Sequence, residues 1–252
     1  MDYTSVLSNS CIMKSSLLLL FLFSLYTLPL FSQGKNEVHY TEDILLGKSE
    51  AQLYNDTLPL AIPAAKAFIK MYKAAKKEGI LLEIVSGYRS YERQKSIWNR
   101  KYKANEAAGL SPSENIKKII EYSTLPGTSR HHWGTDVDLI DGSKTKEGDV
   151  LVAEKFHGNG PYVRMKSWMD QNANRFGFFL PYTNDSLRPG FYYEPWHYSY
   201  APLSIPLLQS YLKMDLNKVL ITDGLEGRAS LTPVFVKEYF EKNILGIDGR
   251  LK

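Results

Sequence analysis

Two adjacent histidines and two aspartates lie within one short stretch of the chain, GTSRHHWGTDVDL (127–139). Imidazole nitrogens and carboxylate oxygens are good zinc ligands. His131 and Asp138 are seven residues apart, which would place them on opposite faces of one continuous strand. Gly134 lies between them and allows a turn, so that His131 can fold back beside Asp138. The stretch therefore fits either half of a metal site or an exposed polar turn.

A second stretch, YYEPWHYSY (192–200), could complete such a site. A catalytic zinc ion usually has three protein ligands and a fourth position for water. His197 would be the third ligand, and Glu194, three residues earlier, would be a general base beside the metal. A surface pair of glutamate and histidine has the same spacing, so this stretch alone leaves both interpretations open.

A third stretch, SGYRSYERQ (86–94), carries Arg89 between an apolar run and a helical pattern. This position is typical of the end of a strand. A guanidinium group there can pair with a carboxylate or stabilise an oxyanion. The alternative is a surface arginine bonded to a nearby acid.

Together, the three stretches resemble the D-alanyl-D-alanine carboxypeptidase family of zinc peptidases, in its VanY-like branch. The signature of that group is S-x-H-x-x-G-x-A-x-D followed by E-x-x-H. The resemblance as a whole covers residues 57–202. The matching residues are Ser129, His131, Gly134, Asp138, Glu194 and His197.

The resemblance implies one Zn²⁺ per chain, held by His131, Asp138 and His197. It also implies that Glu194 is the catalytic base. Arg89 would stabilise the transition state or hold the carboxylate of the substrate.

Four further residues have less specific roles in this interpretation. Ser129 and Gln94 match positions near the substrate pocket. Asp136 stands where the signature usually has alanine, and it would either support a ligand from behind or replace Asp138 as the ligand; we prefer Asp138. His132 is expected to support the site or to pack beside it.

The function implied by the resemblance is zinc-dependent hydrolysis of a peptide bond in peptidoglycan stem peptides, with D-alanyl-D-alanine carboxypeptidase activity as the leading hypothesis. A D,D-dipeptidase or a peptidoglycan endopeptidase of the same fold is an alternative. A non-catalytic wall-binding module in which zinc is a structural staple is another, but such a module would need no base at position 194.

The composition argues against a disordered protein and against a nucleic-acid-binding protein. The 252 residues carry a net charge of +4, with 44% hydrophobic and 23% charged residues, as in ordinary globular proteins. The densest basic run, KMYKAAKKEG (70–79), has the spacing of the solvated face of a helix, so we expect no nucleic-acid partner. The oligomeric state does not follow from the sequence.

The N-terminal 33 residues have the layout of a secretory signal peptide, with Lys14 followed by an apolar run (17–31). Met13 is an alternative start. The run is shorter than the roughly 20 residues of a spanning helix, so membrane attachment is expected only if the segment stays uncleaved. We therefore expect export to the periplasm or the cell envelope. The only cysteine, Cys11, precedes the run, so a mature chain would have no thiolate for a metal.

We expect an α+β fold: a single domain with a small, mainly antiparallel sheet flanked by helices and the zinc site at the sheet. Apolar residues at helical spacing predict helices, and β-rich or alternating runs predict strands. Helices are predicted within 58–79, 91–109 and 161–178, and strands within 80–89, 135–140 and 191–201. The predicted divisions are a loosely packed lead-in (34–56), the catalytic-type domain (57–202) and a C-terminal helical extension (203–252).

Overall fold

The computed structural model describes residues 40–49, 52–216 and 224–252. Residues 39–252 form one compact unit. The predicted signal peptide lies outside the described residues. Among the described helices, none combines the length and the apolar character needed to cross a membrane.

Helices and strands are mixed along this unit without regular alternation. Their bounds are α1 Glu42–Leu46, β1 Leu53–Asn55, β2 Leu58–Ala61, α2 Ile62–Lys77, β3 Leu82–Ser86, α3 Tyr91–Ala107, α4 Pro112–Ile119, β4 Asp136–Asp141, α5 Val163–Asn172, β5 Phe178–Phe179, β6 His197–Tyr200, α6 Ala201–Tyr211 and α8 Pro233–Tyr239.

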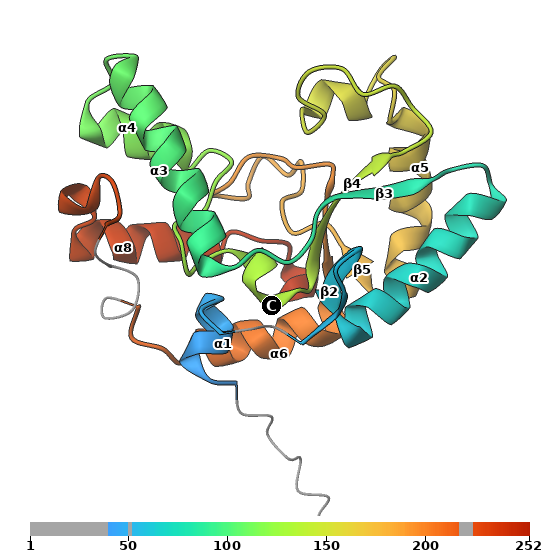
Figure 1. Cartoon of the computed structure of the whole chain (residues 1–252), viewed down its shortest axis with the longest axis horizontal. Coiled ribbons are helices and arrows are strands. Elements are labelled where there is room, and N and C mark those ends of the chain that lie inside the picture. Colours follow the sequence, from blue (N-terminus) through green and yellow to red (C-terminus); the bar gives the residue numbers. More distant parts are fainter. Residues whose placement is uncertain (1–39, 50–51, 217–223) are drawn as a thin grey trace, which may run out of the picture. The chain divides into compact units, whose positions relative to one another are not determined.

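The main sheet has four strands in the order β3-β4-β6-β5, and every neighbouring pair is antiparallel. Strands β1 and β2 form a separate antiparallel pair. In Figure 1, α2 and α5 lie to one side of the sheet and α3, α4 and α8 to the other. This arrangement confirms the predicted α+β class with a small antiparallel sheet flanked by helices.

The register of the sheet places the two halves of the sequence motif side by side. Asp138 in β4 is paired with Ser86 of β3 on one side and with His197 of β6 on the other. Strand β4 is buried along its whole length. Two polar segments far apart in the sequence therefore meet in the interior, where side chains are shielded from water.

Two apolar cores hold this arrangement. One packs α2 and α5 against the sheet; its helix α2 contributes Phe68, Met71 and Ala75 from one face. Helix α2 ends at Lys77, and Gly79, with φ of 74°, follows the C-cap residue Glu78 in the left-handed conformation. The other core joins α1, α3, α4, α6 and α8.

The lead-in is more tightly packed than predicted. Leu45 and Leu46 of α1 are each 2% exposed, and the indole nitrogen of Trp133 donates a hydrogen bond to the carbonyl of Leu45 at 3.0 Å. The expectation of little packing is therefore wrong for α1, because these two leucines cover a tryptophan beside the histidine motif.

The C-terminal extension also packs onto the unit. The predicted boundary at 202/203 falls inside α6. The hydroxyl of Tyr211 donates to the carbonyl of Gly127 at 2.9 Å, and the hydroxyl of Tyr239 accepts from the backbone N–H of Leu125 at 3.1 Å. The extension thereby supports the loop that leads into the motif.

Candidate active site

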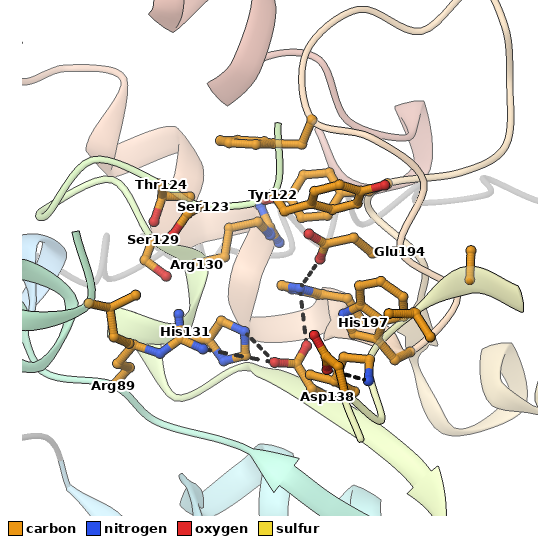
Figure 2. Close-up of a pocket in the computed structure, with 18 of the residues that line it drawn as sticks. Arg89, Tyr122, Ser123, Thr124, Ser129, Arg130, His131, Asp138, Glu194 and His197 are labelled. Carbon is orange, nitrogen blue, oxygen red and sulfur yellow. Dashed lines mark hydrogen bonds and ion pairs between the residues drawn. The ribbon is translucent and has the colours of Figure 1, made fainter. Parts of the chain in front are cut away.

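His131, Asp138 and His197 come together in the fold, and all three are buried. One nitrogen or oxygen atom from each lies within 4.8 Å of the other two. Figure 2 shows the two imidazoles on either side of the Asp138 carboxylate. Among the described residues, this is the group of histidines and acids with the spacing of a metal site.

The turn at Gly134 brings His131 beside Asp138. His131 lies in a short 3₁₀ helix (Arg130–Trp133), and Gly134 ends that helix with φ of 65°. A Cβ atom at this position would lie 2.9 Å from the backbone nitrogen of Ala61. The left-handed conformation and the close contact both require glycine here.

Hydrogen bonds orient both imidazoles. Nδ1 of His131 bonds the carbonyl oxygen of Gly87 at 2.7 Å, so Nδ1 carries the hydrogen and Nε2 is left facing Oδ2 of Asp138 at 3.4 Å. Nε2 of His197 bonds Oδ1 of Asp136 at 2.9 Å, so its Nδ1 faces Oδ1 of Asp138 at 3.4 Å. Each ring therefore has one nitrogen held from behind and the other directed at the same carboxylate.

The donor set fits a divalent metal. Oδ1 of Asp138 is buried and receives no hydrogen bond from the described residues, an arrangement that is costly unless a cation is nearby. Burial raises the pKa of Asp138, but the nearby imidazoles and Arg89 outweigh it, so the pKa is below its ordinary value. Two imidazole nitrogens and one carboxylate are a ligand set that zinc takes in proteins.

Asp136 is saturated by other partners. It is fully buried and accepts hydrogen bonds from Arg130 Nε at 2.9 Å, Thr135 Oγ1 at 2.6 Å and Ser199 Oγ at 2.9 Å, besides His197. Burial raises its pKa, but the charge of Arg130 and the contact with His197 outweigh it and hold the pKa well below its ordinary value. This geometry favours a supporting role for Asp136 behind His197. It disfavours Asp136 as a metal ligand in place of Asp138.

Glu194 is buried at the same point. Its backbone N–H donates to the carbonyl of Tyr182 at 3.1 Å, and its Oε2 lies 3.0 Å from Nδ1 of His197. Burial raises the pKa of Glu194. Burial lowers the pKa of His197, but the bonds to Asp136 and Glu194 and the charge of Asp138 outweigh it and raise the pKa to about 10.

Arg89 is fixed next to this group. Its Nη1 donates to Oε1 of Gln94 at 2.8 Å and its Nη2 to Oγ of Ser86 at 2.8 Å, while Nη2 lies 3.8 Å from Oδ2 of Asp138. Figure 2 shows the guanidinium group directed toward Asp138. A fixed cation at this distance can bind a carboxylate or an oxyanion.

Gln94 and His132 lie behind Arg89. Gln94 is fully buried, and its Nε2 donates to the carbonyl of Thr124 at 2.8 Å, so both ends of its amide are occupied within the protein. Nδ1 of His132 donates to the carbonyl of Arg89 at 2.6 Å, and its Nε2 accepts from the N–H of Gly127 at 3.0 Å. Burial lowers the pKa of His132 to about 3. These bonds within the protein disfavour a direct contact of Gln94 or His132 with substrate.

A pocket of about 430 Å³ opens onto the group. Ser129 lines it, whereas Gln94 does not. Its walls come from α3, from the 122–124 loop, from the 149–154 segment and from the aromatic residues around Glu194. The lining residues are Arg89, Ile97, Lys101, Tyr122, Ser123, Thr124, Ser129, Arg130, His131, Asp138, Asp149, Leu151, Val152, Ala153, Glu154, Tyr182, Phe191, Glu194, Trp196 and His197.

Most lining residues were not singled out in the sequence, and three of these have charged or aromatic side chains that bear on the site. Arg130 stands within the histidine motif. Asp136, six residues later, replaces the alanine of the family signature, and this nearby acid could have pointed to Arg130. Tyr182 packs its ring edge-on against His197 at 5.0 Å, yet it comes from a turn-rich loop without any motif. Lys101 is one of three lysines in α3, and nothing in the sequence distinguishes it from the other two.

The comparisons with known proteins agree with this geometry. A model of the VanY family, described as D-alanyl-D-alanine carboxypeptidase, matches residues 58–203. The chain belongs to this family. The predicted family is therefore confirmed.

Two curated relatives match about half of this VanY-family chain. A D-alanyl-D-alanine carboxypeptidase of Enterococcus faecalis is 31% identical over 132 residues, which are 52% of this chain and 44% of the relative. The bifunctional D-Ala-D-Ala dipeptidase and carboxypeptidase VanXYC of Enterococcus gallinarum is 32% identical over 123 residues, 48% of this chain and 57% of the relative. The matched regions thus span about half of each relative's length.

A solved structure supports the fold. VanYB in complex with D-alanine-D-alanine superposes with a TM-score of 0.51 at 23% identity, covering 70% of this chain and 91% of that one. The VanY-type fold is therefore shared.

Proposed function

We propose that the protein is a zinc-dependent D-alanyl-D-alanine carboxypeptidase that acts on peptidoglycan stem peptides. The observation that carries the proposal is the convergence of His131, Asp138 and His197 on one point in a pocket that also contains Glu194. Membership of the VanY family supports the same reaction.

His131 through Nε2, Asp138 and His197 through Nδ1 would hold the metal ion. Zinc bound there would act as a Lewis acid toward the scissile carbonyl and the attacking water. The buried walls of the site strengthen this effect, because electrostatic interactions are less screened away from bulk water.

Glu194 would accept a proton from the attacking water and deliver it to the leaving amine of D-alanine. Its carboxylate lies within hydrogen-bond distance of His197, and therefore beside the reacting atoms. Burial raises its pKa, which makes it a better proton acceptor than an exposed glutamate.

Arg89 would bind the terminal carboxylate of the peptide or the oxyanion that forms during attack. Gln94 and His132 would position Arg89, one through its guanidinium group and the other through its backbone carbonyl. Ser129 would contact the substrate, because it lines the pocket beside Arg89.

The size of the pocket favours a peptide over a free dipeptide. The cavity reaches from the proposed ligands to Lys101 of α3, which leaves room beyond the two residues at the scissile bond. A structural staple is disfavoured because Glu194 is a buried acid beside the proposed ligands, and a staple gains nothing from it.

Export of the protein is part of the proposal. Peptidoglycan lies outside the cytoplasm, and residues 1–33 have the pattern of a signal peptide. The protein would then act in the periplasm or at the cell envelope, with one Zn²⁺ and without a nucleic-acid partner.

Digestion of defined peptides tests the proposal. Zinc-loaded protein is incubated with a stem pentapeptide that ends in D-Ala-D-Ala, with free D-Ala-D-Ala and with a crosslinked stem dimer, and the products are identified by mass. We expect release of one D-alanine from the pentapeptide and none after chelation of the metal. Cleavage of the dipeptide or the dimer alone would replace the proposal with the corresponding activity.

A further inference from the structure

Lys101 is the lysine of the pocket wall. It lies in α3, lines the cavity and is only partly exposed. Within the described residues, no hydrogen bond or ion pair engages its ammonium group. The other two cations of the pocket have roles already: Arg130 is bonded to Asp136, and Arg89, held by Gln94, is assigned to the terminal carboxylate or the oxyanion at the scissile bond. The ammonium group is thus available to a bound molecule.

The surroundings disfavour a lone charge at this position. Burial lowers the pKa of Lys101, while the carboxylates of Glu194 and Asp149 act in the opposite direction. A partly desolvated ammonium group without a partner gains free energy when an anion reaches it.

The helix fixes how far Lys101 lies from the reacting centre. Gln94, Ile97 and Lys101 are spaced three and four residues apart, so they share one face of α3. Seven residues of helix rise about 10 Å. Gln94 holds Arg89 beside the proposed metal ligands, so the backbone of Lys101 stands about 10 Å farther along the helix, where α3 lines the pocket.

A peptide bound along this wall would place a side chain at Lys101. An extended chain advances about 3.3 Å per residue, so about three residues separate the scissile bond from Lys101. Because a carboxypeptidase cleaves next to the C-terminus, those residues lie on the amino side of the scissile bond.

We propose that Lys101 selects peptides that carry a carboxylate two to four residues before the scissile bond. This inference rests on the proposed function for the orientation of the peptide. It adds an acidic peptide as the substrate class and assigns its recognition to a residue of the pocket wall.

Asp149 is the rival partner of Lys101 within the protein. It lines the same pocket but is exposed, and its carboxylate accepts the backbone N–H of Leu151 at 3.0 Å. No ion pair within 4.0 Å joins it to Lys101 in the described residues. Asp149 therefore leaves the ammonium group accessible.

The test measures binding of matched peptides to zinc-loaded E194Q protein, which avoids turnover during the measurement. The peptides end in D-Ala-D-Ala and carry glutamate or glutamine at the second, third or fourth residue before the scissile bond. We expect one of the glutamate peptides to bind about five- to tenfold more tightly than its glutamine partner. K101M should abolish this preference, since Met keeps the apolar stem, and K101R should restore it.

Lys103 supplies the matched control. It lies in the same helix but pairs with Glu226 at the surface, at 3.3 Å, and its side chain is 67% exposed. K103M should therefore retain the full preference for glutamate.

Each outcome decides the inference. The inference is overturned if K101M keeps the preference for glutamate. It is also overturned if the glutamate and glutamine peptides bind equally in every pair, or if no peptide binds. Parallel turnover by wild-type protein separates this inference from the proposed function. If a peptide binds with a Lys101-dependent preference but no D-alanine is released, only the proposed function fails. Release of D-alanine at equal efficiency from the glutamate and glutamine members of every peptide pair overturns only the proposed role of Lys101.

Discussion

Asp136 accepts a hydrogen bond from Nε2 of His197, while Asp138, two residues farther along the same strand, faces Nδ1 of the same ring. Both aspartates lie in β4, and His197 is the cross-strand partner of Asp138 in β6. The antiparallel register of β4 and β6 therefore places the His197 imidazole between its support, Asp136, and a second proposed metal ligand, Asp138.

D136N should lower the affinity for zinc about 10- to 100-fold, because the amide no longer holds His197 as strongly. It should also destabilise the fold by about 3–5 kcal/mol, since Arg130 then lacks its buried counter-charge. Competition with a chromogenic chelator measures the affinity, and urea unfolding the stability. S199A keeps the charge of Asp136 and removes one donor to it and one acceptor of Arg130, so it should have a smaller effect on both. An unchanged zinc affinity in D136N would exclude the supporting role.

E194Q should reduce the release of D-alanine from a stem pentapeptide about 10²- to 10⁴-fold, because a neutral amide cannot accept the proton of water. Zinc content and thermal stability should stay close to those of wild type, which separates loss of chemistry from loss of the site. Rates equal to wild type would remove Glu194 from the mechanism.

Chelation should abolish turnover, return of zinc should restore it, and the far-UV circular dichroism should stay unchanged. The fold should persist because the strands of the site are held by two apolar cores. Zinc at 100 times its dissociation constant should stabilise the protein by about 2.7 kcal/mol. H131A should lose this zinc-dependent stabilisation. Global unfolding upon chelation would instead indicate a structural metal.

Q94L should lower kcat about 10- to 100-fold with little change in zinc affinity, because Arg89 loses the partner that fixes its guanidinium group. The unpaired carbonyl of Thr124 should destabilise the fold by about 1–3 kcal/mol. R93M, which changes an exposed neighbour on α3, serves as the control and should match wild type. Steady-state kinetics with a stem pentapeptide would contradict the positioning role if only KM changed.

G134A should destabilise the protein more than G148A does. Both glycines have φ near 60°, at 65° and 58°, so each alanine costs about 1–2 kcal/mol in backbone strain. Only at position 134 would the added Cβ collide with backbone, the nitrogen of Ala61. Zinc affinity should fall in G134A alone, because the turn carries His131. Equal urea midpoints for the two variants would show that the contact at Ala61 is relieved without cost.

The sequence alone determined the family, the antiparallel α+β class and the stretches that meet at the site. These features depend on local order: the spacing of His131, Gly134 and Asp138, the three-residue spacing of Glu194 and His197, and the helical period of α2. Short-range geometry limits what such patterns can form, so they can be interpreted without knowing the neighbours in space.

Tertiary structure decided the partners. The bond between Arg130 and Asp136 spans six residues, yet its value as a buried pair depends on strand β6 closing over it. Likewise, the packing of Leu45 on Trp133, the support of Gly127 by Tyr211 and the place of Lys101 in the pocket follow from contacts between distant segments. Burial and cross-strand register arise only when the chain is folded, because they depend on which segments exclude water from one another.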